Sequence, residues 1–369
     1  MTTKYKLKQN SDFVVIGGNR PEVIKLSELV KSFDDNYKMA FLYTGQHYSY
    51  NMKGMFKEEL DIEFDHDLNC GSADVFVLKD NITKCFRECL NPSYVIVYGD
   101  TNSTLAAALA AKQVGSKLIH IEAGLRSFDS NMVEERNRIR IDSMSDYLLA
   151  PTVLNRTFLE YENITNNVFV TGNLIVDVCR KFSKNAILKG DYPARYLLLT
   201  LHRAESVDDP RTLRLLAKYI AEINYDVIFP VHPRTRNNLM KHNIQMPKNL
   251  KMIDPVGYAD FIALLQNCWV VLTDSGGVQE EAVILRKPCI TLRTSTERQE
   301  TLLIRANRLF PLLGNDNFRS LNDVIEEASG TNITINPYGE NVTHNVLDKL
   351  YNIIDHGLGA KQILSQRYS

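Results

Sequence analysis

The sequence predicts an α/β protein with two Rossmann-like, doubly wound domains. Short apolar runs alternate with longer amphipathic stretches, which is the pattern of βαβ units around parallel sheets. This alternation occurs twice, on either side of an irregular stretch near residues 180–195 that lacks clear periodicity. The length of 369 residues also favours two domains, because a single compact core of that size is uncommon.

The first series begins with a strand at 12–16 that ends in Gly17 and Gly18. A helix is expected to follow at Pro21, because proline supplies no amide and therefore suits a first helical turn. Further strands are expected at 39–43, 94–98, 117–121, 147–150 and 168–170, and helices at 75–90, 103–114, 134–145 and 154–160.

The second series predicts a second parallel sheet. Its strands are expected at 197–201, 226–231, 250–253, 269–273 and 289–292. One helix is expected to begin at Asp209-Pro210, and another is expected to span 258–266. The predicted organisation is a first domain over 1–180, a second over 181–345, and a C-terminal segment, 346–369, that packs back on the first domain. Ligands of such sheets bind at the carboxyl ends of the strands, so we expect the functional residues along a cleft between the domains.

Composition narrows the class of protein. Hydrophobic residues make up 44% and charged residues 24%, as in a globular protein, and a net charge of −1 provides no basic field for nucleic acid or an anionic membrane. The lysines near the N-terminus precede no apolar segment, so no secretion signal is expected. The 6 cysteines lack framework spacing, which predicts reduced thiols in a cytoplasmic protein.

Acidic residues follow the expected strands of the first half. Asp100 comes after the strand at 94–98, Glu122 after the strand at 117–121, and Glu134 opens the next helix. A carboxyl group at such a strand end can be desolvated and act as a base. The structural alternatives are that Asp100 caps a helix and that Glu134 forms a surface pair with Arg138. Three carboxylates at successive junctions favour a shared site over independent caps.

The second half offers a histidine and a glycine-rich turn at strand ends. His202 follows the strand at 197–201, where it could donate a proton near neutral pH or tie down its own loop. The strand at 269–273 leads into Ser275, Gly276 and Gly277, where helix amides favour a phosphate, although a simple tight turn would look the same. Glu281, one turn into that helix, could hydrogen-bond ribose hydroxyls.

Cations and aromatic residues near these turns could complete a nucleotide site. Arg298 follows a further strand and could bind a diphosphate with two hydrogen bonds, and Arg20 and Lys25 lie near the first strand. Phe261 could stack on a base, although core packing is the more common fate of an aromatic residue. Histidines at paired ligand spacing and a Cys/His quartet are both missing from the sequence, so neither a metal nor a cofactor is expected.

With these residues in place, the chain resembles the non-hydrolysing UDP-N-acetylglucosamine 2-epimerases over about residues 14–350. The motifs that carry the resemblance, in order, are GGNRPEVIKL, TGQH, YGDTNSTLAAALAA, HIEAGLRSF, VEERNR, LHRAES, PVHP, TDSGGVQEEA and TERQE. The resemblance implies a fold like that of B-type glycosyltransferases, an active site in the interdomain cleft and a homodimer. The implied partner is a UDP-sugar substrate.

The resemblance also implies residue roles and a reaction. Catalytic roles fall on Asp100, Glu122, Glu134 and His202. Substrate-binding roles fall on Arg20, Lys25, Arg138, His232, Phe261, Ser275, Gly276, Gly277, Glu281 and Arg298, and an allosteric UDP-sugar site on Gln46 and His47. The implied reaction inverts C2 of UDP-N-acetylglucosamine by anti elimination of UDP to 2-acetamidoglucal and syn re-addition, for a surface or capsular glycan.

Several other functions stay open on the sequence. The substrate could be UDP-2,3-diacetamido-2,3-dideoxyglucuronic acid or a UDP-6-deoxy amino sugar, and the product could be released by hydrolysis. A glycosyltransferase or a non-catalytic UDP-sugar sensor would share the fold. The chain departs from the family pattern at Asn19, Val133, Val283, Arg286 and Gln299, which bears on substrate identity more than on reaction type.

Overall fold

The computed structural model describes residues 11–45, 56–313 and 319–367, with side chains described to residue 355. The chain divides into two compact units, and each is considered by itself. The first unit comprises Met1–Leu125, Ser130–Val178 and Tyr338–Ser369, and the second comprises Arg126–Asp129 and Cys179–Pro337. Residues 126–129, 179–180 and 338–345 therefore lie in different units from those that the expected boundaries gave them.

The first unit is built on a parallel sheet whose described strands follow the order β3-β2-β1-β4-β5-β6-β7. The strand order reverses direction at β1, which is the topology of a doubly wound Rossmann-like sheet. The strands are β1 (Phe13–Gly17), β2 (Met39–Tyr43), β3 (His66–Asp67), β4 (Tyr94–Tyr98), β5 (Lys117–Ile121), β6 (Tyr147–Ala150) and β7 (Val168–Val170). All of their pairings are parallel.

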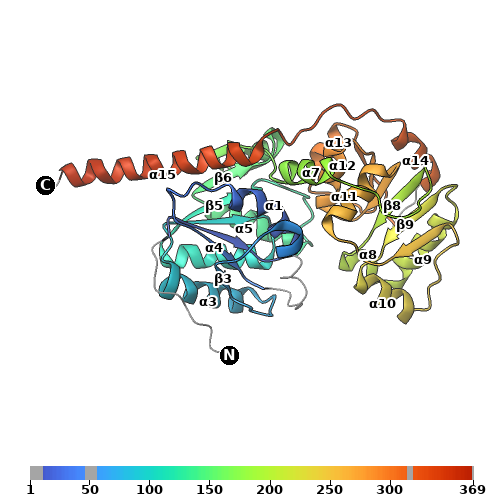
Figure 1. The fold of residues 1–369 in the computed structure, drawn as a ribbon, viewed down its shortest axis with the longest axis horizontal. Coiled ribbons are helices and arrows are strands. Elements are labelled where there is room, and N and C mark those ends of the chain that lie inside the picture. Colours follow the sequence, from blue (N-terminus) through green and yellow to red (C-terminus); the bar gives the residue numbers. More distant parts are fainter. Residues whose placement is uncertain (1–10, 46–55, 314–318, 368–369) are drawn as a thin grey trace. The chain divides into compact units, whose positions relative to one another are not determined.

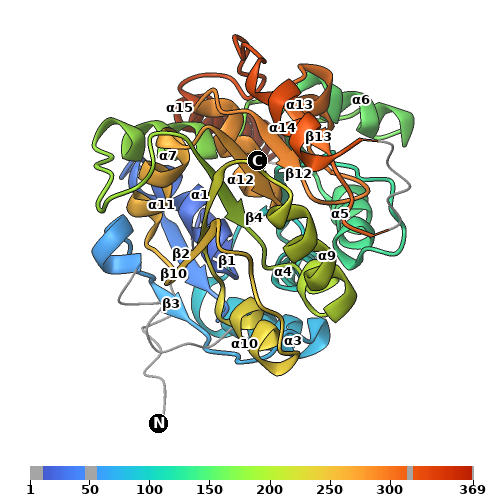
Figure 2. The ribbon, with the colours of Figure 1, turned by 90° about the vertical axis from the view of Figure 1, so that its right-hand side faces the viewer.

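Helices connect and cover these strands (Figures 1 and 2). They are α1 (Arg20–Lys31), α3 (Val75–Cys85), α4 (Asn102–Val114), α5 (Val133–Met144), α6 (Val153–Tyr161), α7 (Ile175–Lys184) and α15 (Val342–Arg367). Successive side chains of a strand point to opposite faces, and in β1 both Val14 and Val15 are fully buried. Helices therefore cover both faces of the first sheet, as its continuous apolar strands require.

The second unit repeats this topology with the strand order β10-β9-β8-β11-β12-β13 among the described residues. Its strands are β8 (Tyr196–Thr200), β9 (Asp226–Pro230), β10 (Leu250–Ile253), β11 (Val270–Thr273), β12 (Cys289–Thr291) and β13 (Asn307–Leu309). Its helices are α8 (Ala204–Val207), α9 (Pro210–Ala221), α10 (Pro233–Lys241), α11 (Tyr258–Asn267), α12 (Gly276–Ile284), α13 (Gln299–Leu303) and α14 (Leu321–Ser329). The expected α/β class with two Rossmann-like parallel sheets is confirmed.

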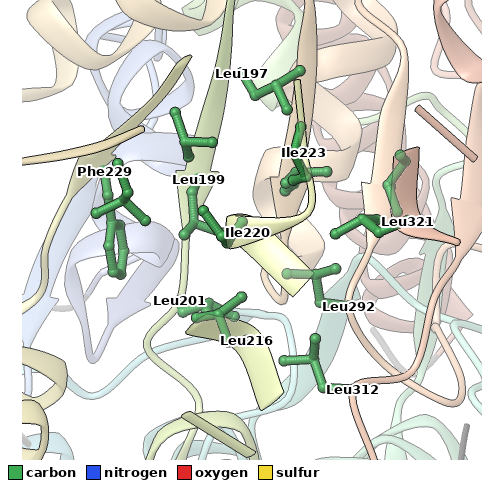
Figure 3. Packing of buried hydrophobic residues seen from close by; sticks show 14 of the residues in the cluster. Leu197, Leu199, Leu201, Leu216, Ile220, Ile223, Phe229, Leu292, Leu312 and Leu321 are labelled. Atoms are coloured by element: carbon green, nitrogen blue, oxygen red, sulfur yellow. The ribbon is translucent and has the colours of Figure 1, made fainter. Parts of the chain in front are cut away.

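Leucines of β8 and the residue just after it form the centre of the second unit's core. Leu197, Leu199 and Leu201 are at most 2% exposed and join one apolar cluster with Leu216 and Ile220 of α9 (Figure 3). Each fully buried leucine contributes on the order of 2 kcal/mol relative to an exposed one. The packing fixes β8 firmly, so the polar loop that follows it starts from a rigid strand.

Some expected elements differ from the structure for local reasons. The expected helix at 75–90 ends as an α-helix at Cys85 and continues as a π-helix, Phe86–Leu90, that stops at Asn91 with φ 38°. The irregular stretch expected from residue 180 is wrong at its start, because α7 extends to Lys184. The buried residues of α7, such as Val176 and Cys179, precede residue 180, so a window that begins there misses the periodicity.

The C-terminal helix α15 packs on the first unit next to the loop that follows α1. The rings of Tyr351 and Tyr37 stack with centroids 4.5 Å apart, and the hydroxyl of Tyr351 accepts a 2.7 Å hydrogen bond from the Asp34 amide. The hydroxyl of Tyr37 donates to Asp355 over 3.1 Å. Within the described part of the chain, helices that combine the length and apolarity needed to cross a membrane are absent.

Candidate active site

Asp100 lies at the carboxyl end of β4, and Arg138 of α5 binds it. The Nε and Nη2 atoms of Arg138 lie 2.8 and 2.6 Å from Oδ2 of Asp100. The side-chain amide of Asn137 donates a 2.9 Å hydrogen bond to the backbone carbonyl oxygen of Asp100. Asp100 is not the N-cap of α4, because Thr101 occupies that position. Helix α5 therefore holds the Asp100 carboxylate at the sheet edge.

Glu134 and Arg138 do not form the surface pair that was the structural alternative. Arg138 is buried and uses its remaining nitrogen, Nη1, to bind Glu135 over 2.6 Å. Glu134 occupies the first turn of α5 and is half-buried. A half-buried carboxyl at a helix start keeps access to solvent or to a ligand.

Glu122 is the second carboxylate of this sheet edge and follows β5, the neighbour of β4. Its Oε2 atom lies 2.6 Å from Nζ of Lys25 and accepts a 2.5 Å hydrogen bond from the Tyr98 hydroxyl. Asn173 lies 3.2 Å from the same hydroxyl. Glu122 is only 6% exposed, so the Lys25 ammonium compensates a carboxylate charge that water does not reach well. Lys25, expected to bind substrate, thus contacts an expected catalytic residue.

Glu22 is a buried carboxyl that the sequence did not suggest as functional. It accepts hydrogen bonds from the Gly18 amide over 2.6 Å and from the Thr104 hydroxyl over 3.3 Å. Burial raises the pKa of Glu22 to about 7, and the nearby charge of Asp100 acts in the same direction. Its position in the first turn of α1 is typical of a capping residue, so the sequence offered no signal of this environment.

In the second unit, Asp274 holds the loop that carries His202. Asp274 follows β11, is fully buried, and accepts the amides of His202 and Arg203 over 3.1 and 2.9 Å. The Nδ1 atom of His202 lies 3.3 Å from Oδ1 of Asp274. Burial alone would raise the pKa of Asp274, but the hydrogen bonds from His202 and Arg203 hold it below its usual value. This contact leaves Nε2 of the half-exposed His202 ring for a ligand.

His232 lies beside His202, with ring centroids 6.4 Å apart. Its Nδ1 atom accepts a 3.2 Å hydrogen bond from the Arg234 amide at the start of α10, so the ring carries its hydrogen on Nε2 when neutral. Burial lowers the pKa of His232, and the charges of His202 and Arg234 add to the effect. The two histidines therefore present ring nitrogens at the ends of adjacent strands.

The start of α12 has the geometry of an anion site. Ser275 is the N-cap, and within the described residues its side chain makes no capping hydrogen bond to the helix amides. A Cβ on Gly276 would come within 2.4 Å of Oε1 of Glu297, whereas a Cβ on Gly277 would meet its first neighbour, the Ser275 hydroxyl, at 4.0 Å. The space above Gly277 is thus open, and first-turn amides attract a phosphate there.

Arg298 lies close to this helix start, inside a buried network of charges. Its Nε atom donates to Glu280 of α12, and Nη1 lies 3.8 Å from Glu297. Glu297 also binds Arg203 over 3.2 Å and Arg293 over 3.0 Å. A cation held this way is preorganised for an anionic ligand, and its removal would leave buried carboxylates uncompensated.

Comparison with known proteins adds to this geometry. The family model described as UDP-N-acetylglucosamine 2-epimerase matches residues 31–350. UDP-N-acetylglucosamine 2-epimerase of Methanocaldococcus jannaschii is 41% identical over 339 residues, which cover 85% of this chain and 90% of the relative. This chain belongs to the UDP-N-acetylglucosamine 2-epimerase family.

A solved structure and one further relative bear on the fold and the substrates of the family. A crystal structure of the M. jannaschii UDP-GlcNAc 2-epimerase in complex with UDP-GlcNAc and UDP has a TM-score of 0.80 and 37% identity, with 92% of this chain and 99% of that chain covered. UDP-2,3-diacetamido-2,3-dideoxy-D-glucuronate 2-epimerase of Pseudomonas aeruginosa is 38% identical over 315 residues, or 80% of this chain and 87% of that relative.

The remaining candidate residues of this family member occupy varied environments. Arg20 lies 3.5 Å from Glu59, and Phe261 is half-buried against the apolar cluster of Leu198 and Val278. Glu281 is buried beside Tyr258, whose pKa burial raises well above its usual value while the Glu281 charge adds to the shift. The expected allosteric residues Gln46 and His47 lie outside the described residues.

Within each unit, the structure brings several candidates together. Asp100 meets Arg138, Lys25 meets Glu122, and in the second unit His202 lies by His232. Sequence reasoning missed Tyr98 and Asn173 beside Glu122, Asp274 beside His202, and the buried carboxyl group of Glu22. Only Asp274 carried a usable signal, because it is a polar residue directly after an apolar strand.

Proposed function

We propose that this epimerase-family member inverts C2 of UDP-N-acetylglucosamine, giving UDP-N-acetylmannosamine without net hydrolysis. The observation that carries the proposal is the pair of carboxylates at the ends of two adjacent strands. Asp100 follows β4 and is bound by Arg138, whereas Glu122 follows β5 and is bound by Lys25. The ligands of the M. jannaschii relative, UDP-GlcNAc and UDP, support the substrate class.

The reaction that fits these groups is elimination followed by re-addition. The C2 proton of an N-acetylhexosamine is not adjacent to a carbonyl group, so direct removal of this proton is poorly driven. If a carboxylate takes the proton, the C–H electron pair forms the C1=C2 bond. The C1–O bond breaks at the same time, and UDP leaves with the electron pair of that C1–O bond. The intermediate is 2-acetamidoglucal. Re-addition delivers a proton to the other face of C2 and a UDP oxygen to C1.

The first unit supplies acids and bases for both faces of C2. The family resemblance assigns catalytic roles to three of its carboxyl groups, Asp100, Glu122 and Glu134. Lys25 fixes Glu122, and Arg138 fixes Asp100. A fixed carboxylate can transfer a proton without first reorganising its surroundings. Proton transfer by such a positioned acid or base contributes about 10²–10⁴-fold to the rate. Arg138 and Lys25 thus serve the chemistry by holding carboxylates in place.

The second unit stabilises the departing diphosphate. Its proposed donors are the His202 ring, the buried guanidinium of Arg298 and the first-turn amides of α12, where a Cβ on Gly277 would have open space. Preorganised donors at developing negative charge contribute on the order of 3 kcal/mol each to catalysis. Binding of UDP by these groups also retains the leaving group for re-addition.

Incubation of the protein with UDP-N-acetylglucosamine in heavy water tests the proposal. We expect proton NMR to show a second UDP-N-acetylhexosamine, with deuterium at C2 of both sugars and little free sugar. Glu122→Gln should abolish the exchange at C2 while the dissociation constant of UDP stays close to that of the wild type. Release of free N-acetylmannosamine would indicate a hydrolysing enzyme, and binding without exchange would indicate a sensor.

A second candidate substrate is UDP-2,3-diacetamido-2,3-dideoxyglucuronic acid. The P. aeruginosa relative named for this substrate is 38% identical, against 41% for the M. jannaschii relative, so identity favours neither sugar strongly. The ratio of kcat/KM for the two nucleotide sugars decides between them. A ratio above unity for UDP-N-acetylglucosamine supports the main proposal, and a ratio below unity supports the diacetamido acid.

We also propose that the enzyme is a homodimer, as the family resemblance implies. Helix α3 exposes Phe76 by 70% and Val77 by 45%, and such apolar side chains suit an interface between copies. Light scattering after size exclusion should report twice the chain mass of 42.1 kDa. A mass equal to one chain would contradict the homodimer and leave the proposed reaction untouched.

A further inference from the structure

His120 is a buried histidine that the proposed chemistry does not use. It lies in β5, two residues before Glu122, and is 1% exposed. Its Nδ1 atom lies 2.7 Å from Oδ1 of Asp142 on α5, and its Nε2 atom lies 2.8 Å from the carbonyl oxygen of Gly99. Asp142 is also buried, at 1% exposure.

The partners of His120 determine where its hydrogens are. A carbonyl oxygen only accepts, so Nε2 must carry a hydrogen that it donates to Gly99. On the other side, one proton lies between Nδ1 and the Asp142 carboxyl, whichever atom holds it. The second oxygen of Asp142 accepts the Gly124 amide over 3.2 Å. The ring and carboxyl therefore form a continuous chain of hydrogen bonds from Gly99 to Gly124.

The two ends of this chain are the loops that carry the catalytic carboxylates. Gly99 directly precedes Asp100, and its φ of 71° places it in a turn that leaves β4. Gly124 follows Glu122 by two residues, and its φ is 81°. A Cβ on Gly124 would meet the Asn155 carbonyl oxygen at 2.3 Å, so this loop has little room to shift. Both loops depend on the same pair of buried side chains.

We propose that His120 and Asp142 are positioning residues, which align the peptide before Asp100 with the loop after Glu122. The inference rests on the proposed epimerase function for its catalytic readout. Both carboxylates already have cations at their side chains, but a cation fixes only the carboxylate end. The His120–Asp142 pair fixes the backbone from which the carboxylates extend. It also joins both loops to α5, the helix that provides Arg138.

Two substitutions of His120 separate its hydrogen bonds. His120→Gln places an amide near the position of Nε2 and retains the donor to Gly99, whereas His120→Asn retains a donor near Nδ1 and loses the link to Gly99. We expect kcat of the Asn variant to fall by about 10- to 100-fold, as for a catalytic group displaced by a fraction of an ångström to 1 Å. The Gln variant should recover much of that loss. UDP affinity should stay unchanged in both.

A control variant distinguishes positioning from a general loss of stability. Ile141→Val removes one methyl group next to Asp142, from a residue that is fully buried in the apolar core of the first unit. It should lower the melting temperature while kcat stays close to the wild-type value. Equal kcat for the Gln and Asn variants, or a loss of kcat that follows melting temperature across all three variants, would overturn the proposal.

The wild-type protein offers a test that does not depend on activity. Nitrogen-15 labelling of histidine should reveal a ring whose Nε2 hydrogen exchanges slowly with water, because the His120 ring is buried. His120→Gln should remove this signal. An Nε2 atom without a hydrogen on the buried His120 ring would overturn the proposal directly. Absence of epimerase activity in the wild type would instead count against the proposed function and leave this result standing.

Discussion

Burial raises the pKa of Glu22 to about 7, so the folded protein resists ionisation of this residue. The unfolded chain ionises it near the ordinary value of 4.5. Below pH 4.5 the carboxyl is protonated in both states, and its contribution to stability is fully present. That contribution is lost as the pH rises through 7, and the loss amounts to roughly 3 kcal/mol at most.

Glu22→Gln removes this titration. We expect the free energy of unfolding of the variant, relative to the wild type, to increase by up to roughly 3 kcal/mol between pH 4 and pH 8. Urea unfolding at a series of pH values measures the difference. Glu58→Gln, at an exposed position of the same unit, should show no comparable trend. A pH-independent difference for Glu22→Gln would mean that this carboxyl is well solvated.

Asp274 makes a second prediction at the scale of one residue. Its contact with Nδ1 of His202 orients the ring, so Asp274→Asn should leave His202 in the wrong tautomer or rotamer. Loss of a carboxylate that orients a catalytic histidine can cost up to about 10⁴-fold in kcat, and we expect at least about tenfold here. Asp209→Asn, which alters the cap of α9 and the ion pair of Asp209 with Arg211, is the matched control. Equal kcat for both variants would contradict a role for His202.

Among the elements, the start of α12 gives the clearest test of nucleotide binding. Gly277→Ala adds a methyl group where the first protein atom is 4.0 Å away, so the fold should tolerate it and gain slightly from the better helix former. If a diphosphate binds these amides, the methyl group occupies its place. We expect the dissociation constant of UDP to rise by about tenfold or more. A tenfold rise corresponds to a loss of ~1.4 kcal/mol of binding free energy.

Gly276→Ala is the contrasting variant. Its methyl group would approach Glu297 within 2.4 Å, so it should lower the melting temperature through the buried charge network. Calorimetry of both variants with and without UDP separates the two effects. Unchanged UDP affinity in a stable Gly277→Ala protein would remove the start of α12 from the nucleotide site.

Most strands were predictable from the sequence, and two short polar ones were not. β2, β4, β5, β6, β7 and β10 match their expected bounds because each contains a run of apolar residues. β3 consists of two polar residues, and β13 has one apolar residue in three, so neither gives an apolar run. The π-helix after α3 escaped prediction as well, because its sequence does not differ in pattern from an α-helix.

At the scale of the whole molecule, the repeated topology was predictable, but the contacts between side chains were not. Polar residues after strands pointed to Asp100, Glu122 and His202, because parallel strands bring their carboxyl ends to one edge of a sheet. The sequence could not show that Lys25 contacts Glu122, which lies 97 residues away. Such pairs depend on strand register and helix rotation, which local patterns do not encode.

The division of work in the chain follows from that topology. Each unit presents polar residues at the ends of buried strands, with Asp100 and Glu122 in the first unit and His202 and the start of α12 in the second. If C2 inverts by departure and return of UDP, as proposed, the C1–O bond must break in every turnover. An oxygen label in that bond reports the cleavage directly.

UDP-N-acetylglucosamine labelled with oxygen-18 in the bond from C1 to the β-phosphate is therefore the substrate of choice. If UDP departs and rotates before it returns, phosphorus-31 NMR should show the label moving to non-bridging positions of the β-phosphate during epimerisation. Epimerisation at C2 with the label still in the bridge would contradict elimination, and with it the assignment of Arg298 and the start of α12 to a leaving diphosphate.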